Sequence, residues 1–189
     1  MRALIVIIAT IIAMAFDSSF GGVFTLRSVG SITPLAMPCL LVFIALFAPK
    51  TIVLVLSIVL GVLVDLSPGQ GQLTGGIHLI GPHALGYLVT VLFVLKIRVV
   101  VFRRRVLTIA VLAAGSVIVT GSVYAFVMLA RGVLHWTPPA SGGGIEAFAK
   151  LLGTAIYTGL LAVPLGWCML ATIGMWRFQS PTSRRATWR

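Results

Sequence analysis

Apolar and polar positions in this chain alternate in long blocks, not at the two-residue period of a half-buried strand. Six apolar runs are long enough for helices that cross a membrane wholly or in part. They cover residues 3–16, 35–47, 51–66, 77–97, 106–130 and 145–176. The pattern predicts an all-α fold. Residues 51–66 reach only about 24 Å as a helix, so short spans are expected to pair as a hairpin or to thin the membrane locally.

The first apolar run ends at Asp17-Ser18-Ser19 and has two interpretations. Ala13-Met14-Ala15 matches the small-x-small pattern at which signal peptides are cleaved. Alternatively the run is a retained helix that continues towards residues 20–24 and packs through Ala9 and Ala13. We favour the retained helix, because the rest of the chain has the pattern of a membrane bundle.

Composition places the chain among membrane proteins. Hydrophobic residues make up 59% and charged residues 9%, whereas charged residues alone supply about a quarter of a soluble domain. We therefore expect a polytopic transmembrane bundle of six helices over residues 1–177, followed by a short basic tail at 178–189. The net charge of +11 does not indicate nucleic-acid binding, because the basic residues flank apolar runs and form no basic domain.

The basic residues also predict an orientation. If the N-terminus is cytoplasmic, six spans place eleven basic residues inside and only Arg27, Arg131 and Lys150 outside, so both termini are predicted to be cytoplasmic. The inner set is Arg2, Lys50, Lys96, Arg98, Arg103, Arg104, Arg105, Arg177, Arg184, Arg185 and Arg189. The run Arg103–Arg105 is interpreted as a determinant of this topology, with anionic lipid or a cytoplasmic partner as the alternative.

The acidic residues are few, and one of them stands out. Asp17, Asp65 and Glu146 are the three acidic residues of the chain, and all fall towards the outer side. Ser57, Gly61 and Asp65 are spaced four residues apart, so they share one face of a helix. A carboxylate at membrane depth costs about 2.5–3.5 kcal/mol and normally faces protein or a cavity. The alternative is that Asp65 lies level with the lipid headgroups at a helix end.

Other reactive side chains do not form a recognisable catalytic or metal site. His78 and His83 are five residues apart with no glutamate between them, so we interpret them as interfacial or cavity-lining, not as metal ligands. Cys39 and Cys168 each lie in an apolar run and are expected to be small core residues. Glu146, four residues before Lys150, suits the start of the sixth helix.

Enzymatic activity is not indicated by any motif in the sequence. No serine or cysteine has a neighbouring base, the glycine-rich segment 69–76 lacks the lysine of a phosphate loop, and nothing pairs Asp65 with another carboxylate. No cofactor is expected. Packing motifs are better represented: Gly121 with Ala125, and Ala162 with Gly166, are small-residue pairs that let helices approach closely. Pro164 predicts a bend in the sixth helix.

One stretch resembles a known family. Gly61-x-x-x-Asp65-Leu66, a Ser/Pro/Gly turn, and then Gly81-x-His83-Ala84-Leu85-x-Tyr87-Leu88 resemble the core motif of MreD, the bacterial rod shape-determining membrane protein family. The turn is longer here than in that family, and Pro82 precedes His83 where the family usually has leucine. The size, the six spans and the basic cluster after the fourth span are also similar to MreD proteins.

The resemblance implies a non-enzymatic scaffold in the bacterial inner membrane. MreD-like proteins are similar in fold to the substrate-binding subunits of energy-coupling-factor transporters. They bind the single transmembrane helix of MreC within the machinery that synthesises peptidoglycan during elongation. On this basis Gly61, Asp65, Gly81, His83 and Leu85 would line the face between the third and fourth spans. With Ser57 and His78, they form the predicted partner or pocket face.

A second function class shares the same topology. A vitamin-type binding subunit of an energy-coupling-factor transporter would use Asp65, His78 and His83 as a ligand pocket near the outer surface. Gene neighbourhood distinguishes the two classes. An adjacent MreC or MreB reading frame favours the scaffold, and an ATPase with a coupling membrane subunit favours the carrier.

Overall fold

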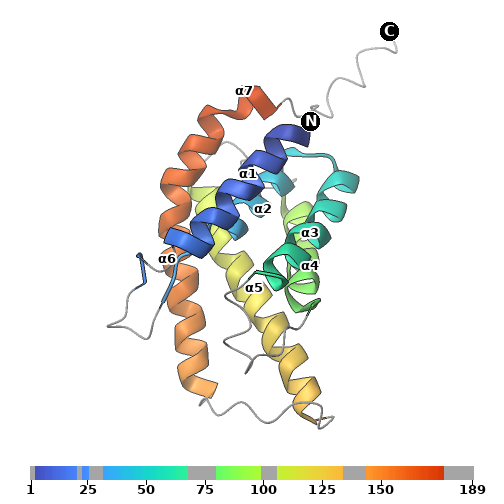
Figure 1. Cartoon of the computed structure of the whole chain (residues 1–189), viewed down its shortest axis with the longest axis vertical. Coiled ribbons are helices and arrows are strands. Elements are labelled where there is room, and N and C mark those ends of the chain that lie inside the picture. Colours follow the sequence, from blue (N-terminus) through green and yellow to red (C-terminus); the bar gives the residue numbers. More distant parts are fainter. Residues whose placement is uncertain are drawn as a thin grey trace.

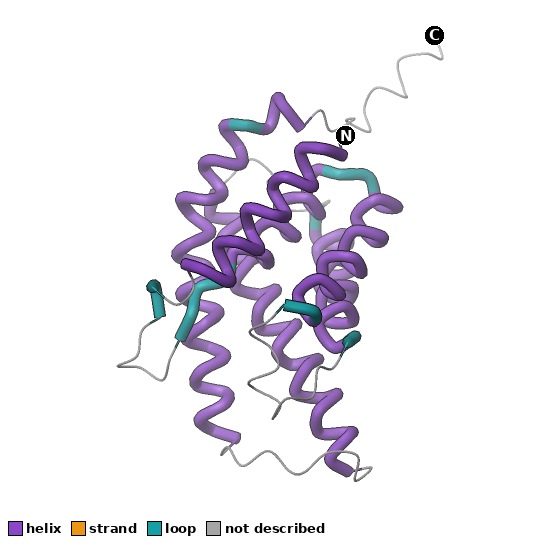
Figure 2. The backbone as a smooth tube through the Cα atoms, viewed as in Figure 1, coloured by secondary structure: helices purple, strands orange, loops and turns teal. Residues whose placement is uncertain are grey.

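The computed structural model of the chain describes residues 3–20, 23–25, 32–67, 80–98, 106–133 and 144–176. Every regular element in these ranges is a helix, which confirms the all-α prediction. The helices are α1 (Ala3–Ala15), the π-helical turn η1 (Phe16–Phe20), α2 (Ala36–Phe47), α3 (Lys50–Asp65), α4 (Pro82–Ile97), α5 (Val106–Val133), α6 (Gly144–Ala171) and α7 (Ile173–Trp176). Figures 1 and 2 show a bundle in which α5 and α6 extend beyond the other helices at one end.

Two helices are long and apolar enough to cross a membrane, namely Val106–Arg131 within α5 and Ala147–Ala171 within α6. The stretch Leu4–Ser19 and the helices α2 and α4 are apolar but shorter. The helix predicted over residues 77–97 begins at Pro82, and residues 77–79 lie outside the described ranges. The predicted sixth helix stays helical through Pro164 and is first interrupted at Thr172.

Helix α2 lies at the centre of the bundle. It has 12 residues, and 11 of them are buried. Helices α1, α3, α4, α5 and α6 all contact it. Its apolar residues on every face are typical of a helix enclosed in this way. At about 18 Å in length, α2 is a core helix, and its backbone ends lie within the bundle.

The N-terminus of α2 is capped by side chains from distant elements. Oδ1 of Asp17, on η1, accepts a hydrogen bond from the N–H of Ala36 at 2.6 Å, and Oδ2 accepts one from Met37 at 3.1 Å. The N–H of Leu35 donates to Oγ1 of Thr158 on α6 at 3.2 Å. The first N–H groups of a helix have no intrahelical partner. The sequence indicated only that Asp17 ends the first apolar run. The structure shows that its side chain also caps α2.

The C-terminus of α2 is capped by a cation. Nη1 of Arg98, just after α4, donates to the carbonyl oxygens of Ala45 at 3.3 Å and Ala48 at 2.9 Å. A guanidinium suits this position because the C-terminal carbonyl groups carry partial negative charge. Arg98 was predicted only to contribute to membrane topology, and the structure gives it a second role that secures the core helix.

Replacement of Arg98 by alanine should destabilise the fold. The loss of two charge-assisted hydrogen bonds to otherwise unpaired carbonyl groups is expected to lower the free energy of unfolding by about 1–3 kcal/mol. Thermal unfolding in detergent can be followed by reaction of a thiol dye with the buried Cys39 in a Cys168→Ser background. Lys96→Ala is the matched control, because Lys96 is exposed near the end of the same helix. Equal melting temperatures for the two variants would contradict the capping role.

Candidate functional site

The predicted face of α3 packs against α4. Ser57 is 0% and Asp65 is 2% exposed, and Gly61 between them is also buried. A Cβ atom at Gly61 would lie 2.6 Å from the backbone nitrogen of Ala84 and closer still to its Cα. Only glycine permits the two backbones to approach this closely. The prediction that this face looks at protein is confirmed, and the protein it contacts is the next helix of the same chain.

Asp65 caps α4 as Asp17 caps α2. Its Oδ2 accepts a hydrogen bond from the N–H of Gly81 at 2.7 Å. Its Oδ1 accepts a longer one from the N–H of His83 at 3.4 Å and lies 2.6 Å from Nδ1 of the same residue. Backbone and imidazole groups thus surround the carboxylate, which is held inside the protein and is not solvated at a helix end. The positive end of the α4 dipole favours a carboxylate at this position.

Gly81 and Pro82 shape the backbone that Asp65 contacts. Gly81 has φ +127, a conformation that residues with a side chain rarely adopt. Pro82 follows at the first position of the helix, where its missing N–H would have no partner. These two residues turn the N–H of Gly81 towards the end of α3. Asp65, Gly81 and His83 thus join the two helices, and we call this group the clamp.

The remaining predicted site residues are not all part of this clamp. His83 joins it directly and is 16% exposed. Leu85 does not belong to the buried group, because its side chain is 51% exposed. His78 and the run Arg103–Arg105 lie outside the described residues.

Polar residues also line the contact between α4 and α5, and they were not among the predicted site residues. The rings of His83 and Tyr124 lie 5.2 Å apart, and the hydroxyl oxygens of Thr90 and Thr120 lie 3.5 Å apart. Thr90, Ser116 and Thr120 are all buried. Ser116, Thr120 and Tyr124 recur every four residues in the fifth apolar run, a spacing that places them on one helix face. That four-residue spacing is the sequence signal from which this polar face of α5 could have been predicted.

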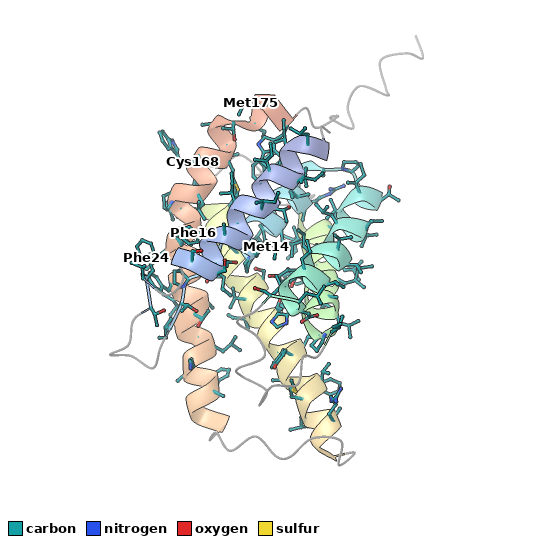
Figure 3. All side chains as sticks on the ribbon, viewed as in Figure 1. Met14, Phe16, Phe24, Cys168 and Met175 are labelled. Atoms are coloured by element: carbon teal, nitrogen blue, oxygen red, sulfur yellow. The ribbon has the colours of Figure 1, made fainter. Side chains whose placement is uncertain are left out.

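Two packing expectations were partly wrong. Cys39 is fully buried as expected, but Cys168 is exposed on α6 (Figure 3). Gly166 packs against α5, and Cys168 two residues later falls on the opposite side of the helix. Gly121 likewise faces Leu151 of α6 as expected, whereas its predicted companion Ala125 is exposed.

The arrangement as a whole serves helix capping. Within the part of the chain that the structure describes, no group of three or more His, Cys, Asp or Glu side chains could hold a metal ion. Asp17 and Asp65 both bind the backbone of a following helix. His83 has one ring nitrogen beside Asp65, which leaves Nε2 as the group that a ligand could contact.

Comparison with protein-family models found no match, and neither curated proteins nor solved structures gave one. Assignment to a family is therefore a proposal that rests on the motif from Gly61 to Leu88.

Replacement of Gly61 by alanine should separate α3 from α4. The added methyl group overlaps backbone atoms of Ala84, which cannot move aside as a flexible side chain does, so we expect a loss of about 1–3 kcal/mol in the free energy of unfolding. Gly115→Ala is the control, because a Cβ there meets nothing within 4 Å. It should be neutral or slightly stabilising. Melting temperatures in detergent compare the two, and a Gly61→Ala protein as stable as Gly115→Ala would contradict the close contact.

Removal of the Asp65 carboxylate should uncap α4 without preventing membrane insertion. Asp65→Leu leaves two N–H groups and the imidazole without an acceptor and is expected to cost about 3 kcal/mol, whereas Asp65→Asn keeps one oxygen acceptor and should cost less. Insertion should persist because the change removes a charge.

A double-mutant cycle of Asp65→Asn with His83→Ala tests the clamp itself. It should give a coupling of at least about 0.5 kcal/mol. Leu85→Ala, on the same helix but exposed, is the control. Additive effects in the cycle would show that the two side chains act independently.

Proposed function

We propose that the chain is a multi-pass membrane protein with six membrane-embedded apolar helices and both termini in the cytoplasm. The support is its apolar outer surface, since large hydrophobic side chains point outwards from every peripheral helix. Examples are Ile11 at 61%, Val55 at 63%, Phe93 at 53%, Leu107 at 71% and Leu160 at 65% exposed. Soluble proteins rarely expose apolar surface on this scale. The excess of basic residues on one side supports the orientation.

Within that setting we propose a non-enzymatic scaffold of the MreD type in the bacterial inner membrane. It would bind an MreC-like single-span protein and help to organise peptidoglycan synthesis with other elongation proteins. The observation that supports this proposal is that the two halves of the motif, residues 61–66 and residues 81–88, contact each other. Gly61 lies against Ala84, and Asp65 binds Gly81 and His83. A motif that fixes two helices together serves a scaffold and performs no chemistry of its own.

The partner helix would use a face that the chain leaves open. The Ser57, Gly61 and Asp65 face is already filled by α4, so it is not available. Helix α4 presents an exposed apolar stripe on its outer side, and this stripe includes Leu85 from the predicted partner face. Its members are Leu85, Val89, Leu92 and Phe93, each 44–53% exposed. Their spacing of about one helical turn suits packing against another helix.

The carrier of the energy-coupling-factor type is the second candidate. The observation that favours it is His83, which is partly exposed and has only one ring nitrogen engaged by Asp65. A small polar ligand could bind the other nitrogen beside Tyr124. In that case an ATPase pair with a coupling membrane subunit, and no MreC-like protein, would be the stable partners.

A detergent pull-down of the tagged protein from its native membrane, with mass spectrometry, separates the two candidates. We expect recovery of MreC and cell-wall synthesis proteins. Val89→Ala combined with Leu92→Ala should reduce that recovery several-fold, and the control Leu160→Ala, at an exposed position on α6, should not. Recovery of an ATPase pair would refute the scaffold, and equal recovery with both variants would refute the α4 stripe as its docking face.

A further inference from the structure

Helix α5 extends well past the end of the α3–α4 hairpin. Asp65 closes α3 and binds the first residues of α4, so both helices reach the same level there. The ring of His83 lies 5.2 Å from that of Tyr124, which places the same level on α5. Nine further residues follow up to Val133, which add about 14 Å of helix. Figure 1 shows this overhang of α5 and α6 at the end opposite α7.

The overhanging part of α5 is as apolar as the rest. Phe126 is 71% and Leu129 is 68% exposed, and no charged residue occurs between Val106 and Arg131. This uncharged length is about 37 Å, enough for a full hydrocarbon core of about 30 Å. On α3, by contrast, Lys50 and Asp65 enclose about 21 Å of helix. The two sides of the molecule therefore present apolar surfaces of different height.

We propose that this protein holds a bilayer that is thinner beside α3 and α4 than beside α5. The lipid headgroups on the outer side settle to the level of Asp65 and His83 along the hairpin, and they stand near Arg131 along α5. This inference rests on the proposed membrane embedding and goes beyond it. A short apolar surface is accommodated most simply by local thinning, and the partly exposed His83 beside Asp65 gives the thin side a polar edge.

Lys150 on α6 marks the limit of the thicker side. Its neighbour Leu151 contacts Gly121, so Lys150 lies slightly deeper than Tyr124, and its side chain is exposed. Side chains on a helix lean towards its N-terminus, and the N-terminus of α6 is at the overhanging end. Arg131 lies seven residues beyond Tyr124, about 10 Å further out. A lysine side chain does not span that distance, so the ammonium group stays below the Arg131 level and the higher membrane surface is confined to α5.

Depth measurements on spin labels test the step in the membrane surface. Cysteines introduced one at a time at Leu66 and Phe126, in a Cys168→Ser background in which Cys39 stays buried, place labels at one level on the two sides of the protein. The full chain is reconstituted in vesicles of phosphatidylethanolamine and phosphatidylglycerol, and the label's collisions with oxygen and with a water-soluble nickel complex give its depth. The label at Phe126 should lie about 7 Å deeper than the one at Leu66, because five residues separate it from Arg131.

A second pair of labels, at Val55 and Ile118, serves as the control. Val55 is level with Thr90, which contacts Thr120, so both labels should lie in hydrocarbon at equal depth. Equal depths for Leu66 and Phe126 would mean a flat membrane surface and would overturn the inference. The inference would also be overturned if the labels at Leu66 and Phe126 were both in contact with water while the control labels lay in hydrocarbon. The overhang would then stand outside the bilayer. An aqueous control pair would instead refute the membrane embedding.

Discussion

The structure depends on hydrogen bonds to the terminal backbone N–H and C=O groups of α2, a short helix that is enclosed on every side. The first N–H groups and the last carbonyl groups of α2 have no partner within the helix, and each such group left unpaired in an apolar interior is costly. A carboxylate on η1, a threonine on α6 and a guanidinium after α4 supply the partners. Because these three come from different parts of the chain, the capping of α2 fixes how the surrounding helices are placed.

In the hairpin of α3 and α4, a carboxylate likewise caps the first N–H groups of a helix. Two of the three acidic residues of the chain lie at the end of one helix and bind the first N–H groups of the next, across 19 residues for Asp17 and 16 for Asp65. A buried carboxylate is tolerated where it has several donors and the positive end of a helix dipole. This explains how so apolar a protein keeps Asp17 and Asp65 inside: they replace backbone partners that an apolar interior does not provide.

Periodicity predicted the helices and the protein-facing stripe of α3 because both depend on local spacing. It did not predict that Asp17 caps α2 or that Arg98 binds Ala45 and Ala48, since those partners are 19 and about 50 residues away. The expectation for Cys168 failed because an apolar run does not say which of its faces meets lipid. Leu85 was grouped with Asp65 through a motif, and its position on the helix turns it outwards instead.

Hydrogen–deuterium exchange of α2 in the reconstituted protein tests the capping of this helix most directly. We expect the amides of residues 36–47 to exchange more slowly than those of the peripheral α1, and Asp17→Ala to speed exchange throughout α2. If exchange in α2 were as fast as in α1, or unchanged by Asp17→Ala, the capped central helix would not be what holds this bundle together.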